Sequence, residues 1–168
     1  MEEKRYDTDA VKVKLAEYVE KVKYYRHQCE RMDRLKTKII GVGAQVLSDM
    51  PKAPSHDNDR AADLIAQKID LEKELGATAA ELVEERRGIE RAISSLKNAD
   101  QKAVILSRYI DGDSFKDVNE LVFGGKVDFA DKEESYMRRV FNIHGAALIG
   151  LAAYYGLYQR DTENTAEA

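Results

Sequence analysis

The sequence has little of what builds cross-linked, metal-centred or membrane-spanning proteins. Its 168 residues include one cysteine, two prolines and no tryptophan. A single cysteine, Cys29, excludes an internal disulfide framework and a cysteine-built zinc site, and it fits a reducing compartment. The longest apolar stretch, residues 145–158, is shorter than the roughly 20 residues that span a bilayer. We therefore expect a cytoplasmic protein without a membrane-spanning segment.

Charged residues, in contrast, are abundant. Lys, Arg, Asp and Glu make up 35% of the chain, and the net charge is −4. The first ten residues, MEEKRYDTDA, are charged where a secretory signal needs an apolar run. This composition is typical of helices with solvated surfaces. It argues against a broadly basic protein that coats nucleic acid, but it is compatible with a local basic patch.

Apolar residues between about residues 9 and 47 recur in alternating steps of three and four. This heptad spacing predicts a long helix that packs against another helix, as in a coiled coil. Asp7 or Thr8 is the expected N-cap, because a short side-chain oxygen accepts from a free amide. The expected seam contains Val11, Leu15, Tyr18, Val22, Tyr25, Cys29, Met32 and Ile39, with Lys36 in one slot.

A second long helix is expected over about residues 59–97. Residues 48–59, SDMPKAPSHDND, separate the two helices and predict a loop because they hold both prolines. Two such helices form an antiparallel hairpin, which leaves apolar surface for a second copy of the chain. We therefore expect a homo-oligomer. The second stripe contains Leu64, Leu71, Leu75, Leu82, Ile89 and Leu96, widened by Ile65, Ile69, Ala79 and Ile93.

Shorter helices are expected after Lys97. Residues 98–110 predict one helix, which Gly112 can close in the left-handed conformation. Ser114 and Asp117 have the spacing of a capping box and predict the start of the next. Asp131 and Glu134 repeat that spacing and predict a helix over 132–157, followed by a disordered tail. The first of these helices should bury Val104, Ile105, Tyr109 and Ile110.

The segment SRYIDGDSFKDV, residues 107–118, contains three aspartates around a glycine. A calcium loop that begins at Asp111 would need an oxygen ligand at its fifth position, glycine at its sixth and glutamate at its twelfth. The chain has Phe115, Lys116 and Val122 there. A helix, a glycine stop, a serine cap and a second helix account for every residue, so the segment predicts the start of a helix-turn-helix motif.

Several segments also carry a family resemblance. ISSLKNADQKAVILSRYIDGDSFKDV resembles region four of bacterial sigma factors. LSDMP (47–51), RYIDGDSFKDV and RRVFNIHGAALIGL (138–151) resemble phage transcriptional regulators of the ArpU and RinA type. The resemblance implies an N-terminal helical region, followed by a sigma-like module that binds duplex DNA and can contact RNA polymerase. It covers the C-terminal half best.

The resemblance implies which residues meet DNA. The helix from Ser114 would brace against the DNA backbone, and the helix after it would enter the major groove. Arginine pairs with guanine and asparagine with adenine, so the exposed positions of that helix have suitable chemistry. Lys116 and Lys126 are the candidates for phosphate contacts. The base-reading candidates are Ser135, Arg138, Arg139 and Asn142, opposite a buried face of Met137, Val140, Phe141, His144, Leu148 and Leu151.

Two features depart from the family pattern. The turn between the motif helices, FGGKVDFADK, is about ten residues long, and acidic Asp131, Glu133 and Glu134 open the second helix. Residues 89–168 hold ten Lys and Arg against thirteen Asp and Glu, so counterion release would contribute modestly to DNA affinity. The departures leave two other functions open. These are a DNA-packaging recognition subunit, and a helical protein-protein interaction module that does not bind DNA.

The sequence thus predicts an all-α protein with three parts. These are a long antiparallel helical hairpin for oligomerisation (residues 1–88), a small helix-turn-helix domain (89–157) and a tail (158–168). No phosphate-binding loop, nucleophile elbow or cluster of metal ligands is recognisable, so we expect no enzymatic activity, cofactor or metal. His144 on an apolar face is expected to be a core histidine.

Overall fold

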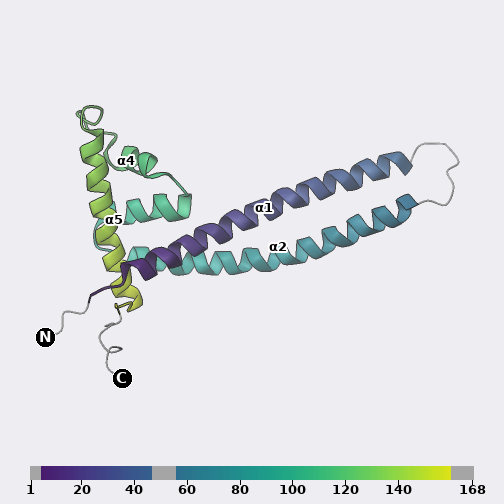
Figure 1. Ribbon diagram of the computed structural model, residues 1–168, viewed down its shortest axis with the longest axis horizontal. Helices are drawn as coiled ribbons and strands as arrows, with labels where there is room; N and C mark the ends of the chain where they lie inside the picture. Colours follow the sequence, from purple (N-terminus) through teal and green to yellow (C-terminus); the bar gives the residue numbers. More distant parts are fainter. Residues whose placement is uncertain (1–4, 47–55, 160–168) are drawn as a thin grey trace, which may run out of the picture. The chain divides into compact units, whose positions relative to one another are not determined.

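The computed structural model describes residues 5–46 and 56–159, and the extended elements within these ranges are all helices (Figure 1). Two long helices, α1 (Thr8–Val46) and α2 (His56–Ser94), run antiparallel and are in contact. They are followed by α3 (Ala99–Ile105), η1 (Leu106–Asp111), α4 (Phe115–Phe123) and α5 (Glu133–Tyr155). The predicted all-α hairpin followed by short packed helices is confirmed.

The chain contacts divide the protein into two units. The terminal unit contains residues 1–19 and 85–168, and the hairpin unit contains residues 20–84. The first turns of α1 and the last turns of α2 therefore group with the short helices, whereas the sequence predicts a boundary after residue 88.

The beginnings of the long helices follow local capping chemistry. The Ala10 amide donates to Asp7 Oδ1 at 2.9 Å, as predicted for an N-cap. Helix α2 begins at His56, three residues before its predicted start at about residue 59. The remainder of the predicted loop, and the whole LSDMP motif, lie outside the described residues.

A small apolar cluster holds the two helices of the hairpin unit together. Met32 and Leu35 of α1 pack with Leu71 of α2, and Leu64 and Leu75 border them. The seam between the helices therefore contains Leu35. The prediction that Lys36 occupies a seam position is wrong, because Lys36 is exposed. The predicted widening of the stripe by Ile65 and Ile69 is also wrong, since these side chains are 46% and 44% exposed.

The short helices of the terminal unit enclose a second core. α3 and α4 both pack against α5. Val104, Val118, Phe123, Tyr136 and Val140 are buried together, and Phe129 from the turn before α5 packs against them. Val104 and Ile105 are buried as predicted, but Tyr109 and Ile110 are only half-buried.

Glycine and serine set the ends of these helices. Gly112 has φ +83°, the left-handed conformation predicted for it. Ser114 accepts from the Asp117 amide while the Asp117 side chain accepts from the Ser114 amide, so the predicted capping box is present. The second predicted box is wrong, because the N-cap of α5 is Lys132, which makes no side-chain cap bond.

The segment between α3 and α4 widens into a π-helical turn. The Ser107 hydroxyl donates to Asp113 Oδ2 at 2.6 Å, and the Asp113 amide donates to the Ser107 carbonyl at 3.0 Å. Arg108 donates to the Asp113 carbonyl at 2.9 Å. These bonds account for Asp113 as a structural residue of the turn.

The two ends of the described chain meet in a short backbone bridge. The Asp7 amide donates to the Leu157 carbonyl at 3.1 Å, and the Gln159 amide donates to the Arg5 carbonyl at 2.9 Å. The rings of Tyr6 and Tyr158 stack with centroids 5.4 Å apart. Tyr158 and Gln159 are therefore ordered parts of the fold, and the rest of the predicted tail lies outside the described residues.

None of the helices in the described ranges combines the length and apolarity that crossing a membrane requires.

Candidate nucleic-acid interface

The base-reading candidates share the exposed face of the first half of α5. Ser135, Arg138, Arg139 and Asn142 are all exposed, as predicted. Their spacing of three, four and seven residues places them on one side of the helix. The structure therefore brings these four side chains together on a surface that a partner can reach.

Arg138 makes an ion pair with the preceding turn of the same helix. Its Nη2 lies 2.7 Å from Glu134 Oε1, and the two side chains are 75% and 84% exposed. Such exposed pairs contribute only about 0.2–1 kcal/mol. The guanidinium of Arg138 can therefore exchange this partner for an external acceptor at low cost.

Arg139 is held differently, against aromatic rings. Its guanidinium carbon lies 4.9 Å from the centroid of Phe123 and 5.6 Å from that of Tyr136. Cation–π contacts of this kind stabilise an exposed site by about 0.5–1 kcal/mol. Arg139 thus joins α5 to the end of α4 in addition to offering hydrogen-bond donors at the surface.

The two phosphate-contact candidates come from elements before α5. Lys116 lies in the first turn of α4, and Lys126 lies in the turn after Phe123, where its amide donates to the Phe123 carbonyl at 2.9 Å. Both side chains are exposed. Within the described residues, no contact joins either lysine to the four candidates on α5.

Asn119 fixes the start of α5 against α4, which the sequence did not reveal. It is fully buried, and its Nδ2 donates to the Glu133 carbonyl at 3.2 Å. Its Oδ1 is buried without a hydrogen-bond partner among the described residues. The only signal in the sequence was an asparagine beside the apolar residue Val118.

Asp128 anchors the long turn before α5. Its carboxylate accepts from Lys132 Nζ at 2.8 Å and from the Tyr136 hydroxyl at 2.7 Å. These two bonds lower the pKa of Asp128 from 3.8 to about 2, and the bond with Lys132 has the larger effect. The turn is therefore attached to α5 at two points, which gives the ten-residue insertion a defined course.

We expect Asp128→Asn to make the protein less stable above pH 4 and to make its stability less sensitive to acid. The native state binds fewer protons at Asp128 than the unfolded chain between pH 3.8 and about 2. The stabilisation is complete above 3.8 and is lost as the pH falls toward about 2. Thermal unfolding of both proteins between pH 5 and pH 2 measures this.

The exposed Asp131 belongs to the same turn and supplies the matched control Asp131→Asn. An equal effect of the two variants would contradict a special role of Asp128.

An aromatic cluster lies where α4 approaches the middle of α5. Phe115 and Phe141 are in tilted contact with centroids 5.0 Å apart, and the Arg108 guanidinium lies 4.9 Å from the Phe115 ring. Phe141 is nevertheless 49% exposed, so its predicted place on the buried face is wrong. Tyr136 is buried in this part of α5 together with Val140, and its ring stacks with Phe123 and with Phe129. Met137, also placed on the buried face, is only half-buried.

His144 lies beside this cluster as a half-buried structural residue. Its Nε2 is 3.0 Å from the Tyr109 hydroxyl, and its ring meets Phe115 edge to face. Burial, followed by the positive charges of Lys12 and Arg108, lowers the pKa of His144. This environment therefore favours the neutral form of the imidazole. No group of three metal-ligating side chains occurs in residues 5–46 and 56–159.

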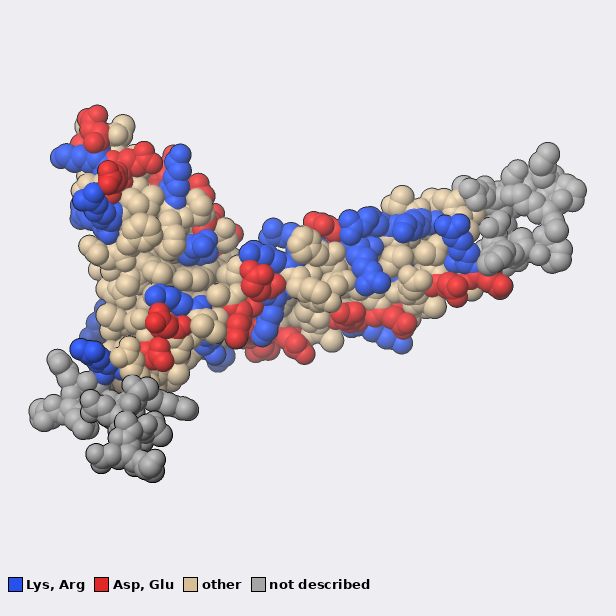
Figure 2. Space-filling view, in the orientation of Figure 1, with Lys and Arg blue, Asp and Glu red and all other residues tan. Residues whose placement is uncertain are grey.

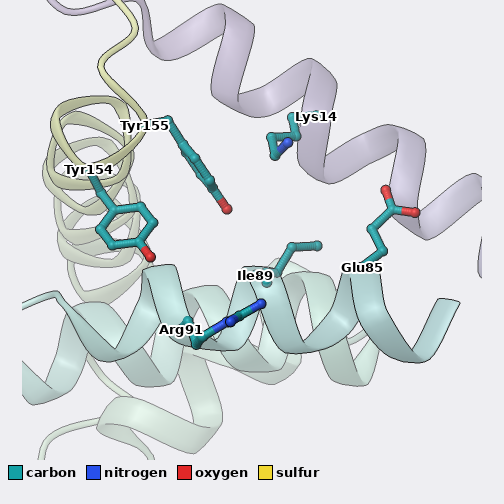
Figure 3. A pocket seen from close by; sticks show the side chains of 7 residues that line it. Lys14, Glu85, Ile89, Arg91, Tyr154 and Tyr155 are labelled. Atoms are coloured by element: carbon teal, nitrogen blue, oxygen red, sulfur yellow. The ribbon is translucent and has the colours of Figure 1, made fainter. Parts of the chain in front are cut away.

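An open hollow of about 300 Å³ lies at the other end of α5 (Figure 3). Lys14 of α1, Ile89 and Arg91 of α2, and Tyr154 and Tyr155 of α5 line it. Lys14 Nζ is 5.0 Å from the Tyr155 ring centroid, and the Tyr155 hydroxyl points toward α2. Burial raises the pKa of Tyr155. The hollow is separated from the candidates in the first half of α5 by several helical turns.

Comparison of the chain with protein-family models, with curated proteins and with solved structures finds no match.

Proposed function

We propose that this protein binds duplex DNA in a sequence-specific manner and acts as a phage-type transcription regulator. The observation that carries the proposal is the surface of α5 on which Ser135, Arg138, Arg139 and Asn142 are exposed together. Arginine and asparagine are the side chains that pair bidentately with guanine and adenine in the major groove. The resemblance to sigma region four and to ArpU- and RinA-type regulators supports the same assignment.

The arrangement around α5 supports a helix-turn-helix mode of binding. α4 packs against α5 and begins at the Ser114 capping box, so its first turn offers Lys116 and backbone amides to a phosphate. α5 then acts as the recognition helix, with Asn119 and Asp128 fixing where it begins. Contact of the same module with RNA polymerase is the corresponding expectation from the sigma resemblance.

The test is binding of the purified protein to fragments of the genome that encodes it, over a series of salt concentrations. We expect retention of one discrete fragment near physiological salt, because base contacts discriminate between sequences whereas phosphate contacts do not. A fragment that contains a promoter supports regulation, and a fragment at a packaging start supports the packaging subunit instead. Uniform binding that disappears with modest salt would contradict sequence-specific recognition.

The second candidate is a protein-protein interaction module. Two observations favour it: Glu133 and Glu134 are exposed at the start of α5, where they would repel phosphate, and Phe141 is 49% exposed on the same helix. This candidate predicts no binding to any duplex at low salt and recovery of a protein partner that depends on Phe141.

A further inference from the structure

The hairpin unit buries few side chains for its length. Among its described residues only Met32, Leu35 and Leu71 are buried. Most of the stability of a helix in a folded protein comes from packing of its apolar face, so two helices with so small a shared core leave contacts unmade. The two flanks of the hairpin unit are open to a partner.

Charge is divided unequally between the two helices of this unit. From residue 20 to 46, α1 has seven Lys and Arg against three Asp and Glu. From residue 56 to 84, α2 has three Lys and Arg against eight Asp and Glu. On the face seen in Figure 2, basic side chains gather along α1 and acidic side chains along α2.

Each helix carries three of these charges on one stripe beside the apolar seam. At about 100° per residue, the basic stripe of α1 and the acidic stripe of α2 are both rotated in the same sense from their buried residues. Because the helices are antiparallel, the same sense of rotation places both stripes on the same face of the hairpin unit. The basic stripe is Arg31, Arg34 and Lys38, and the acidic stripe is Asp63, Asp70 and Glu81.

These six charges have no ionic partner in the described residues. Other charges of the hairpin unit form ion pairs within one helix, such as Lys23 with Glu20 and Lys68 with Glu72. Between the helices, Tyr24 donates a long hydrogen bond of 3.4 Å to Glu74. The basic and acidic stripes are therefore available to an external surface of opposite pattern.

We propose that this face binds the same face of a second copy of the chain, with α1 of each copy lying on α2 of the other. The twofold axis runs parallel to the helices. A rotation of 180° about this axis places the acidic stripe of the second copy opposite the basic stripe of the first, and the basic stripe of the second opposite the acidic stripe of the first. A twofold axis perpendicular to the helices within the interface plane would place α1 on α1 and oppose like charges. The proposal does not depend on DNA binding.

The result is a four-helix assembly in which neighbouring helices are antiparallel. Both copies use the same patch, as in a closed twofold dimer, so the assembly does not extend into a filament. Antiparallel neighbours are also the common arrangement of four-helix bundles. The opposed stripes align the two copies along the bundle.

The experiment is analytical ultracentrifugation of the full chain and of charge-reversed variants at low and high salt. One variant carries Arg31→Glu, Arg34→Glu and Lys38→Glu, and the other carries Asp63→Lys, Asp70→Lys and Glu81→Lys. Each alone is expected to weaken self-association at least about tenfold, since like charges then face each other. The unchanged chain should dissociate as the salt concentration rises.

Mixing the two variants separates an interface from a folding defect. One variant then has two acidic stripes and the other two basic stripes, so a heterodimer is expected to form even though neither self-associates. Far-UV circular dichroism of each variant reports whether it is folded. A mixture of folded variants that stays monomeric would overturn the proposal, as would an unchanged chain that is monomeric at every concentration.

Two further outcomes test the face and the axis. Ile69→Ser alters the other flank of α2, about 110° from the acidic stripe by helical geometry, and should leave association unchanged. Loss of the dimer in this variant would mean that the apolar flank is the interface. A chain with both stripes reversed should pair with itself and not with the unchanged chain, and the opposite preference would overturn the axis.

Discussion

Replacing Leu151 by alanine is expected to destabilise the protein by about 2–5 kcal/mol, because a buried leucine leaves a cavity as well as losing its transfer energy. Leu151 is fully buried in α5 beside Ala152 and Leu148. Loss of the Leu151 side chain therefore weakens the packing of the helix that presents Arg138 and Asn142. Thermal or urea-induced unfolding followed by circular dichroism measures the change.

Ile149→Ala on the same helix is the matched control. Ile149 is 48% exposed, so its removal is expected to change stability by about 0.5 kcal/mol or less. The two substitutions remove the same number of carbon atoms from neighbouring positions. Equal destabilisation would mean that α5 is not packed as described.

Replacing Arg138 by alanine is expected to weaken binding to the specific DNA fragment at least about fivefold, because a bidentate contact to a base contributes about 1–3 kcal/mol. Arg138 is exposed and its ion pair in the described part of the chain is with the exposed Glu134, so this change should leave stability nearly unaltered. Adding Arg139→Ala should reduce the affinity at least about 30-fold in total, because the second base contact contributes free energy in the same range as the first. Fluorescence anisotropy with a labelled fragment measures both.

Two further variants separate base reading from general attraction. Arg138→Lys keeps the charge but lacks the planar fork, so it should lose preference for the specific fragment while keeping the same salt dependence. Arg87→Ala changes an exposed arginine of α2 and should leave specific binding unchanged.

Arg139→Ala alone must be accompanied by a stability measurement, because it also removes the contacts with Phe123 and Tyr136. Unchanged affinity in the double variant would contradict the proposed interface.

Local sequence signals predicted the fold where neighbouring residues alone decide the conformation. α4 begins at Phe115 because two local signals precede it. Gly112 ends the preceding helix in the left-handed conformation, and Ser114 caps α4 through its capping box with Asp117. The same spacing failed at Asp131 and Glu134. There the turn is held instead by Asp128, which bonds to Lys132 and to Tyr136 in the helix beyond.

Choices between adjacent residues were harder to make from the sequence. Leu35 replaces Lys36 in the seam because both fit an alternation of three and four, and only packing with Leu71 decides between them. Tyr136 is buried, and Phe141 is not, because Phe123 at the end of α4 and Phe129 in the turn both stack with Tyr136. The exposed positions of α5 do not depend on packing with other elements. Helical spacing alone therefore predicts correctly that Ser135 and Asn142 are exposed.

The bridge between Tyr6 and Tyr158 has a consequence for how the protein can be joined to other molecules. Arg5 and Gln159 are hydrogen-bonded neighbours, so the two ends of the described chain leave the fold from one place. Closing them with a short linker would cost little loop entropy, and a circular chain should keep the same packing. A fluorescent protein fused directly before Arg5 would therefore lie close to an affinity tag fused directly after Gln159.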